Sequence, residues 1–236
     1  MEHRSRALMK IMMTKRKLQN RAEDKLSKER IIAAAIDILD RGGENALTFR
    51  TLATALSTGS GAIYWYVENK TELLLSATDV VMNLALRKED RQAEPAEIIR
   101  VIALAVFDVI DTHPWVGNQL IREPWRGAML RLGEKIGGQL HRMGIFGPER
   151  FDIWSALFNY ILGVAGQNAA NEQTQAPGVD RETQLTAVAE KWVALPVEQY
   201  PFMIGLAEYL PAHDDRQQFL AGIDLILKGI HHRAEN

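Results

Sequence analysis

Hydroxyl and aromatic side chains are gathered in one short segment near the N-terminal end of the chain. At helical spacing, Ile63 and Val67 fall on one face, which leaves Ser60, Tyr64 and Trp65 on the other. A helix that exposes large aromatic rings gains no stability from them. It does suit the major groove of DNA, about 12 Å wide, where phosphates, base edges and thymine methyl groups are the contacts. The pattern therefore predicts a short helix that reads DNA.

Three helices are predicted to hold this segment in place. The first is amphipathic, is capped by Ser27 and ends at Gly42-Gly43. The second begins after Thr48, whose hydroxyl is placed to cap its free N–H groups. A tight turn over residues 57–59 leads into the third helix, which carries the exposed aromatics over residues 60–67. Two short helices on a tight turn are typical of a helix-turn-helix.

A longer helix is predicted to follow. Asn69 is placed to cap it, and Glu72, three residues further on, gives the pattern of a capping box. The apolar residues that define its inner face are Leu73, Leu74, Ala77, Val80, Val81, Leu84 and Ala85.

The rest of the chain also has helical patterning, without the apolar–polar alternation of strands. After a polar break over residues 88–95, residues 98–110 are apolar nearly all round, which predicts a central helix ended by His113-Pro114. Further segments are a short helix to residue 121, helices over 126–143 and from Pro148, a loop over 174–179, a helix to residue 192, an irregular stretch over 196–211 and a last helix over 214–232. The predicted fold class is all-α.

Two of these helices, over residues 148–172 and 214–232, carry more apolar surface than one core face requires. One side of each helix suffices for packing inside the subunit. The other side suits an isologous interface with a second copy of the chain. We therefore predict a homodimer through these two helices.

The charge distribution separates the N-terminus from the rest. The 236-residue chain has a net charge of −2, but residues 1–26 hold eight Lys or Arg against three acidic residues, a charge of +5. Residues 27–70 are neutral, and the remainder carries −7. A basic end on an acidic body favours a nucleic-acid contact at the N-terminus, with a merely solvated tail as the alternative.

Composition excludes several classes of protein. A chain with 47% hydrophobic and 25% charged residues is typical of a globular protein. The absence of cysteine excludes disulfides, thiolate catalysis and cysteine-ligated metals. Nucleophile-elbow, zinc-protease and Walker motifs are missing, so we expect no catalytic residue, no metal and no cofactor. No apolar stretch approaches the roughly 20 residues that cross a bilayer, and no signal-peptide pattern is present, so a cytoplasmic protein is expected.

Residues 27–75 closely resemble the helix-turn-helix of the tetracycline-repressor (TetR) family of transcriptional regulators. The matching positions are Leu47-Thr48, Arg50, Leu52-Ala53, Ile63-Tyr64, Val67, Asn69-Lys70 and Glu72-Leu73-Leu74. The resemblance implies contacts of Thr48 and Arg50 with backbone or base edges, of Tyr64 and Lys70 with phosphates, and a reading surface of Ser60, Gly61, Ala62, Trp65 and Tyr66. Because Gly61 and Ala62 offer no side-chain hydrogen bond, DNA shape or the basic arm is expected to contribute to discrimination.

Beyond about residue 90 the resemblance weakens, although His113-Pro114-Trp115, Gly144 and the helix over 154–163 are similar to the tetracycline-repressor effector domain. This implies a cavity for a small-molecule effector. Its candidate lining residues are Phe107, Trp115, Gln119, Trp125, Met129, Trp154, Phe158 and Asn159, each with plain core packing as the alternative. The residues that hold magnesium–tetracycline in the founding protein are not recognisable, so tetracycline is not the expected effector.

The sequence therefore predicts a ligand-responsive regulator, most simply a repressor that binds a palindromic operator as a homodimer. Residues 1–26 form a basic arm, residues 27–72 the DNA-binding domain, and residues 73–236 an effector-binding and dimerisation domain. Two alternatives remain open. One is an all-helical small-molecule-binding protein or enzyme with a vestigial helix-turn-helix, and the other is nonspecific DNA binding by the basic arm.

Overall fold

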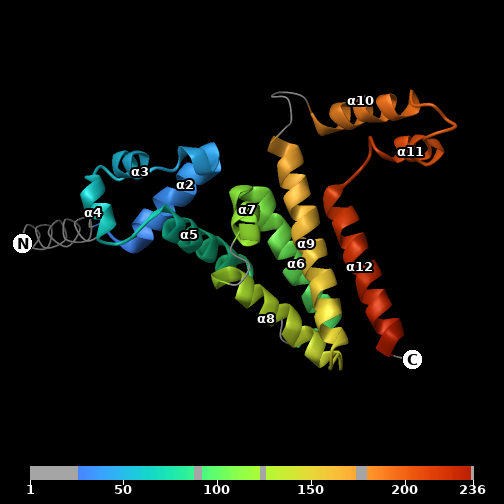
Figure 1. The fold of residues 1–236 in the computed structure, drawn as a ribbon, viewed down its shortest axis with the longest axis horizontal. Helices are drawn as coiled ribbons and strands as arrows, with labels where there is room; N and C mark the ends of the chain where they lie inside the picture. Colours follow the sequence, from blue (N-terminus) through green and yellow to red (C-terminus); the bar gives the residue numbers. More distant parts are fainter. Residues whose placement is uncertain (1–25, 88–91, 123–125, 174–179, 235–236) are drawn as a thin grey trace, which may run out of the picture. The chain divides into compact units, whose positions relative to one another are not determined.

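The computed structural model describes residues 26–87, 92–122, 126–173 and 180–234, and throughout these ranges the regular structure is helical. The chain divides into two compact units, residues 1–77 and 78–236, and the division falls within helix α5, Lys70–Ala85 (Figure 1). The predicted all-α class is confirmed. The basic arm, apart from Leu26, lies outside the described residues, as does the predicted loop over 174–179.

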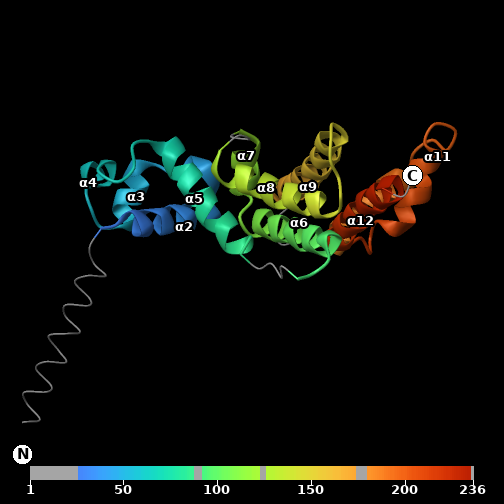
Figure 2. The same ribbon diagram turned by 90° about the horizontal axis from the view of Figure 1, so that it is seen from below.

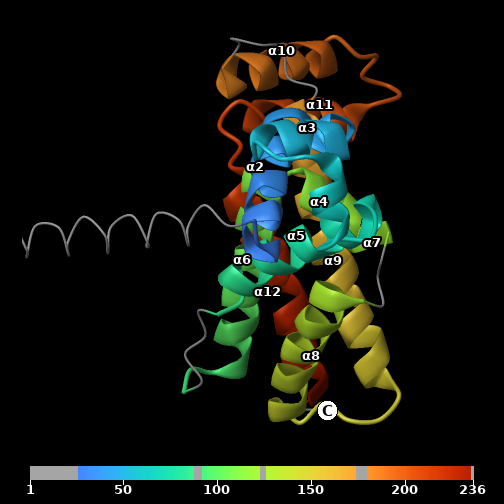
Figure 3. The ribbon, with the colours of Figure 1, turned by 90° about the vertical axis from the view of Figure 1, so that its left-hand side faces the viewer.

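The first unit contains α2 (Lys28–Ala46), α3 (Phe49–Ala55), α4 (Ser60–Tyr64) and the start of α5. Helix α3 packs against both α2 and α4 (Figure 3). The caps predicted from the sequence are present: the Ser27 hydroxyl accepts from the Arg30 N–H at 3.3 Å, and the Asn69 side chain accepts from the Glu72 N–H at 2.9 Å. The core of this unit is built from the inward faces of all four helices, with Ile31, Leu39, Leu52, Ile63 and Leu73 fully buried.

Two predicted helix ends in this unit differ from the structure. The first helix does not stop at Gly42-Gly43 but resumes to Ala46, with Gly43 as a break at φ +64°, a conformation that glycine adopts without steric cost. Helix α4 ends at Tyr64 rather than at residue 67, although Val67 is still buried, as its spacing predicts.

The second unit is organised around α6 (Pro95–Thr112), which packs against α7 (Trp115–Arg122), α8 (Gly127–Arg142), α9 (Glu149–Gln173) and α12 (Asp215–Ala234). Figure 2 shows α6 beside α8 and α12. This confirms the central position predicted from its apolar circumference. Ion pairs between Arg100 and Asp224, at 2.6 Å, and between Arg216 and Asp108, at 3.2 Å, also join α6 to α12.

The remaining elements of this unit are α10 (Arg181–Val193), α11 (Pro201–Leu206) and the 3-10 turn η1 (Ala207–Tyr209), which pack on one another. The stretch predicted to be irregular over residues 196–211 therefore contains a short helix. Pro201 is at the first turn of α11, where its missing N–H costs no hydrogen bond and its fixed φ favours helix.

Helix α5 differs from its predicted inner face in the second half. Val80 is 38% and Leu84 57% exposed, whereas Met82 and Leu86 are buried. The buried side runs through the neighbouring pairs 77–78 and 81–82 to Leu86, so Val80 and Leu84 lie on the outward side of the helix. The periodicity of apolar residues alone does not show which of two adjacent rows of side chains on the helix is buried.

Candidate DNA-binding and effector sites

Thr48 caps α3 through a reciprocal pair of hydrogen bonds. Its hydroxyl accepts from the Thr51 N–H at 3.0 Å, and the Thr51 hydroxyl accepts from the Thr48 N–H, also at 3.0 Å. Ser57, at φ +51°, reverses the chain after α3. This arrangement satisfies the free N–H groups at the start of α3 and leads the backbone directly into α4. The cap and turn predicted from the sequence are therefore both present.

Tyr64 and Trp65 are exposed, as their helical spacing predicts. The Tyr64 ring stacks on Phe49 with centroids 4.3 Å apart and planes 6° apart, and 55% of the residue remains accessible. Trp65 is 88% exposed, because Ile63 and Val67 occupy the buried side of the segment. The end of α4 thus carries an anchored ring at Tyr64, followed at the C-cap by an unpacked indole that gains no packing energy.

Tyr66 has a contact that the sequence does not reveal. Its hydroxyl donates a hydrogen bond of 2.9 Å to the backbone carbonyl of Leu26, forty residues earlier in the chain. The residue is 38% exposed. Tyr66 therefore ties the segment after α4 to the residue that precedes Ser27, the N-cap of α2.

The two predicted phosphate-binding cations have different surroundings. Arg50 is exposed on α3. Lys70, at the start of α5, is partly buried and donates from Nζ to the backbone carbonyl of Glu44 at 2.5 Å. An ammonium group has three donors, so this bond orients Lys70 and leaves others for an oxyanion.

A polar cluster supports the start of α5. The Glu72 carboxylate accepts from the backbone N–H of Glu68 at 2.7 Å and forms an ion pair with Lys28 at 2.9 Å. These contacts, the backbone hydrogen bond above all, lower the pKa of the Glu72 carboxyl from its usual value. The cluster joins the first turns of α2 and α5 on either side of the helix-turn-helix.

All nine predicted DNA-binding residues belong to the first unit. Gly61 is exposed, while Ser60 and Ala62 are partly buried, and the Ser60 hydroxyl lies 3.5 Å from the Phe49 carbonyl oxygen. Thr48 is also exposed, although its hydroxyl is engaged in the cap. Six of the nine are exposed, namely Thr48, Arg50, Gly61, Tyr64, Trp65 and Tyr66, and of these the Tyr66 hydroxyl is already bound to the Leu26 carbonyl.

The second unit contains a hollow of about 410 Å³ between α7, α8 and α9. Four of the predicted effector residues line it: Met129, Trp154, Phe158 and Asn159. The other lining residues were not predicted, because they are small or aliphatic and nothing in the sequence distinguishes them from core residues: Leu120, Ile121, Ser155, Leu162 and Gly163. The hollow has a size and a mostly apolar lining that suit a small organic molecule.

Three other predicted effector residues do not line this hollow. Phe107 packs against Phe219 of α12, with ring centroids 4.9 Å apart. Trp115 is 3% exposed and meets His113 edge to face, and Gln119 is 4% exposed. They are core residues, because α6 and α7 turn these side chains toward the inside of the bundle. Trp125 lies outside the described residues.

Asp79 on α5 holds the start of α8. Its carboxylate accepts from the N–H of Ala128 at 2.7 Å and pairs with Arg131 at 2.7 Å. A carboxylate that accepts a free N–H at a helix N-terminus is stabilised by the helix dipole. The next residue, Met129, lines the hollow, so this contact joins α5 to a wall of the candidate effector site.

A capped helix-turn-helix with exposed aromatics, followed by a helical bundle with an apolar hollow, defines a one-component DNA-binding regulator. The comparisons agree. Residues 31–77 match the family described as bacterial regulatory proteins, tetR family. The repressor DrrR1 of Streptomyces coeruleorubidus is 28% identical over 221 residues, which cover 87% of this chain and 77% of that protein.

Solved structures extend the likeness over both units. The transcriptional regulator SCO7222, a TetR from Streptomyces coelicolor, is 43% identical, with a TM-score of 0.79 over 87% of this chain and 98% of that one. ActR of the same species, solved in complex with actinorhodin, shares the fold at 23% identity and a TM-score of 0.72, over 90% of this chain and 100% of that one. The chain belongs to the TetR family of transcriptional regulators, a family of DNA-binding proteins rather than enzymes. Among the described residues, no helix is long and apolar enough to cross a membrane.

Proposed function

We propose that this chain is a homodimeric repressor that binds a palindromic operator through α4 of each subunit and releases it when a small molecule occupies the 410 Å³ hollow. The observation that carries the proposal is Trp65, 88% exposed beside the anchored ring of Tyr64. A large apolar side chain held in water is unfavourable for the free protein and favourable once it meets thymine methyl groups or sugars in a groove.

Each DNA-binding residue has a role that follows from its surroundings. Arg50 and Lys70 supply charge to phosphates, and the bond from Lys70 to Glu44 orients its ammonium group. The Tyr64 hydroxyl can donate a hydrogen bond to a phosphate, and its ring is held in place by stacking on Phe49. Thr48, Ser60, Gly61, Ala62 and Trp65 form the reading surface, while Tyr66 acts chiefly by binding the Leu26 carbonyl.

The dimer is proposed through the outward faces of α9 and α12. On α9 beyond Asp152 the exposed positions are small or amide residues, from Ala156 to Ala170, and on α12 Leu225 is 71% exposed between Ala221 and Gly229. Within the subunit, the Tyr160 hydroxyl donates to the Phe219 carbonyl at 3.2 Å, which holds the two helices side by side. Their outward faces thus form one surface, and small side chains let the helices of a second copy approach closely. In such a dimer, the two α4 helices are expected about 34–36 Å apart, one turn of DNA.

Release requires that the effector distinguish two conformations of the dimer. Moving the balance between them from 1:99 to 99:1 takes about 5.5 kcal/mol of differential binding. Asp79 supplies a physical route, because a ligand beside Met129 acts on the first turn of α8, which Asp79 holds from α5. Helix α5 begins at Lys70, in the DNA-binding unit. The actinorhodin complex of ActR shows that this fold accommodates a small molecule, which supports an effector of that size here.

The test is selection of operator sequences from random DNA with the purified full-length protein. We expect a palindromic consensus whose affinity falls steeply with salt and exceeds that for random DNA by at least about a thousandfold. The promoter region beside its own gene is the first natural DNA to assay for a mobility shift and for release by added compounds. Recovery of no consensus, or binding equal to that of random DNA at every salt concentration, would contradict the proposal.

A further inference from the structure

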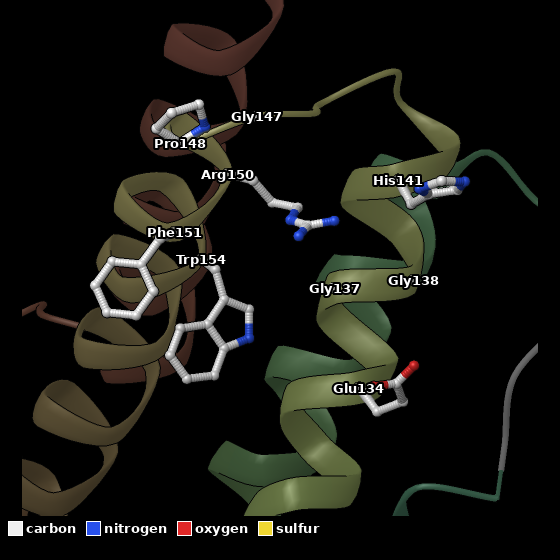
Figure 4. A pocket seen from close by; sticks show the side chains of 9 residues that line it. All are labelled: Glu134, Gly137, Gly138, His141, Gly147, Pro148, Arg150, Phe151 and Trp154. Atoms are coloured by element: carbon white, nitrogen blue, oxygen red, sulfur yellow. The ribbon is translucent and has the colours of Figure 1, made fainter.

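A second hollow, about 690 Å³ in volume, opens between the C-terminal half of α8 and the first turns of α9 (Figure 4). It does not coincide with the 410 Å³ hollow, and Trp154 is the one residue common to the two linings. The residues around it are Glu134, Gly137, Gly138, His141, Gly147, Pro148, Arg150, Phe151 and Trp154. We call it the α8–α9 groove.

The floor of the groove is helix backbone without side chains. A Cβ atom built on Gly137 or Gly138 meets nothing within 4 Å, so neither glycine is required by packing within the subunit. Glycine inside a helix is less favourable than alanine. Gly133, one turn earlier, is different, because a Cβ there would lie 3.1 Å from the Trp154 ring. The two unexplained glycines leave room for a flat group above α8.

The wall of the groove is an aromatic ring in a fixed orientation. The indole N–H of Trp154 donates to the Gly133 carbonyl at 3.2 Å. Its ring is stacked with Phe158 at 4.4 Å and with Phe151 at 6.1 Å between centroids. A ring held in this way offers an aromatic ligand a surface at little cost in side-chain entropy.

The charge in the groove is the Arg150 guanidinium, which has no partner among the residues that the structure describes. Figure 4 shows the Arg150 guanidinium extending from α9 into the space in front of Gly137. Within the described ranges, no hydrogen bond or ion pair involves this group. Arg150 also lies in the first turn of α9, where the helix dipole favours an anion. Glu134 is the one acidic residue that lines the groove. It lies on α8 two turns before His141, nearer the N-terminus of that helix.

We propose that the α8–α9 groove binds a planar aromatic carboxylate. Its ring lies over Gly137 against Trp154, and its carboxylate accepts hydrogen bonds from Arg150, away from Glu134. A planar guanidinium matches a carboxylate with two parallel hydrogen bonds. This site is separate from the effector hollow and does not depend on operator binding.

The test is equilibrium dialysis of the full-length protein against 2-naphthoate and against the uncharged 2-naphthalenemethanol, at low salt. We expect saturable binding of one naphthoate per chain, and binding of the alcohol weaker by at least about tenfold, because the alcohol lacks the charge that strengthens a hydrogen bond to a guanidinium. Arg150→Gln should remove this preference for the acid, and Gly137→Leu should abolish binding of both compounds by filling the groove. Leucine favours helix over glycine, so the second substitution is compatible with α8.

Two control variants test whether the binding is specific to the groove. Lys191→Gln removes an exposed cation of α10 outside the groove and should leave naphthoate affinity unchanged. Ser155→Leu fills the 410 Å³ hollow and should also leave it unchanged. The proposal is overturned if the wild-type protein shows no saturable binding, or if Gly137→Leu retains binding that Ser155→Leu loses. Operator binding, measured separately, tests the repressor and not the groove.

Discussion

Tyr64 lies flat on Phe49, with ring centroids 4.3 Å apart and planes inclined by 6°. The two residues are the last of α4 and the first of α3, so the stack joins the two short helices at their ends. It holds the Tyr64 ring while more than half of the residue remains accessible. Packing on Phe49 and the proposed contact with DNA are therefore separate roles of one side chain.

Substitution of Tyr64 separates these roles. Tyr64→Phe keeps the stack and removes the hydroxyl, so operator affinity should fall about 3- to 10-fold while the free energy of unfolding stays unchanged. Tyr64→Ala removes both and should also lower the free energy of unfolding by about 1 kcal/mol. Fluorescence anisotropy with labelled operator and urea unfolding measure the two quantities. Equal affinity of Tyr64→Phe and wild type would refute a phosphate contact by the hydroxyl.

Arg50→Ala and Lys70→Ala should both weaken operator binding and reduce the slope of log affinity against log salt by about one unit each. Only Lys70→Ala should also lower stability, by about 1 kcal/mol, since Lys70 alone of the pair binds the Glu44 carbonyl. Titrations across a salt series, with urea unfolding of the same variants, check both effects. Unchanged affinity of both variants at fixed salt would refute the assignment.

The stability of the first unit should depend on pH through Glu72. Its folded-state pKa is lowered by the Glu68 N–H and by Lys28, so its contribution is present above the usual pKa of 4.5 and is lost as pH falls through the folded value. The difference in free energy of unfolding between wild type and Glu72→Gln should therefore be full at neutral pH and shrink below pH 4.5. Urea unfolding monitored by circular dichroism at several pH values measures it. A difference that grows on acidification would contradict this sign.

Asp79 should stabilise the second unit by capping α8. Asp79→Ala removes both the acceptor for the Ala128 N–H and the partner of Arg131, and should lower the free energy of unfolding by about 1–3 kcal/mol. Asp79→Asn keeps a carbonyl acceptor and should lose less. Denaturant titration of the two variants provides the comparison, and an equal loss would show that the ion pair, not the cap, is the stabilising contact.

Leu225→Asp should convert the proposed dimer to monomers, because it places a carboxylate at the centre of the α12 face. Operator affinity should then fall at least tenfold, since each subunit would bind a half-site alone. The matched control is Leu130→Asp on α8, where the wild-type leucine is 56% exposed. Sedimentation velocity distinguishes dimer from monomer. A wild-type protein that sediments as a monomer at micromolar concentration would contradict the dimer.

The sequence by itself determined the local elements of this protein. Capping by Ser27, Thr48 and Asn69 depends on hydrogen bonds to residues three positions away, and the inward direction of Ile63 and Val67 depends on helical geometry alone. Such interactions are visible as short-range patterns. The same holds for the central position of α6, which its apolar circumference requires.

Only the tertiary structure decided which side chains meet across the chain. Tyr66 binds the Leu26 carbonyl, Lys70 binds that of Glu44, and Phe107 packs on Phe219 rather than lining the hollow. The partners in these pairs are separated by between 26 and 112 residues, so they depend on how helices cross and rotate. Side chains of one type are equivalent in sequence, and packing alone places Phe107 against Phe219 and Phe158 beside the 410 Å³ hollow.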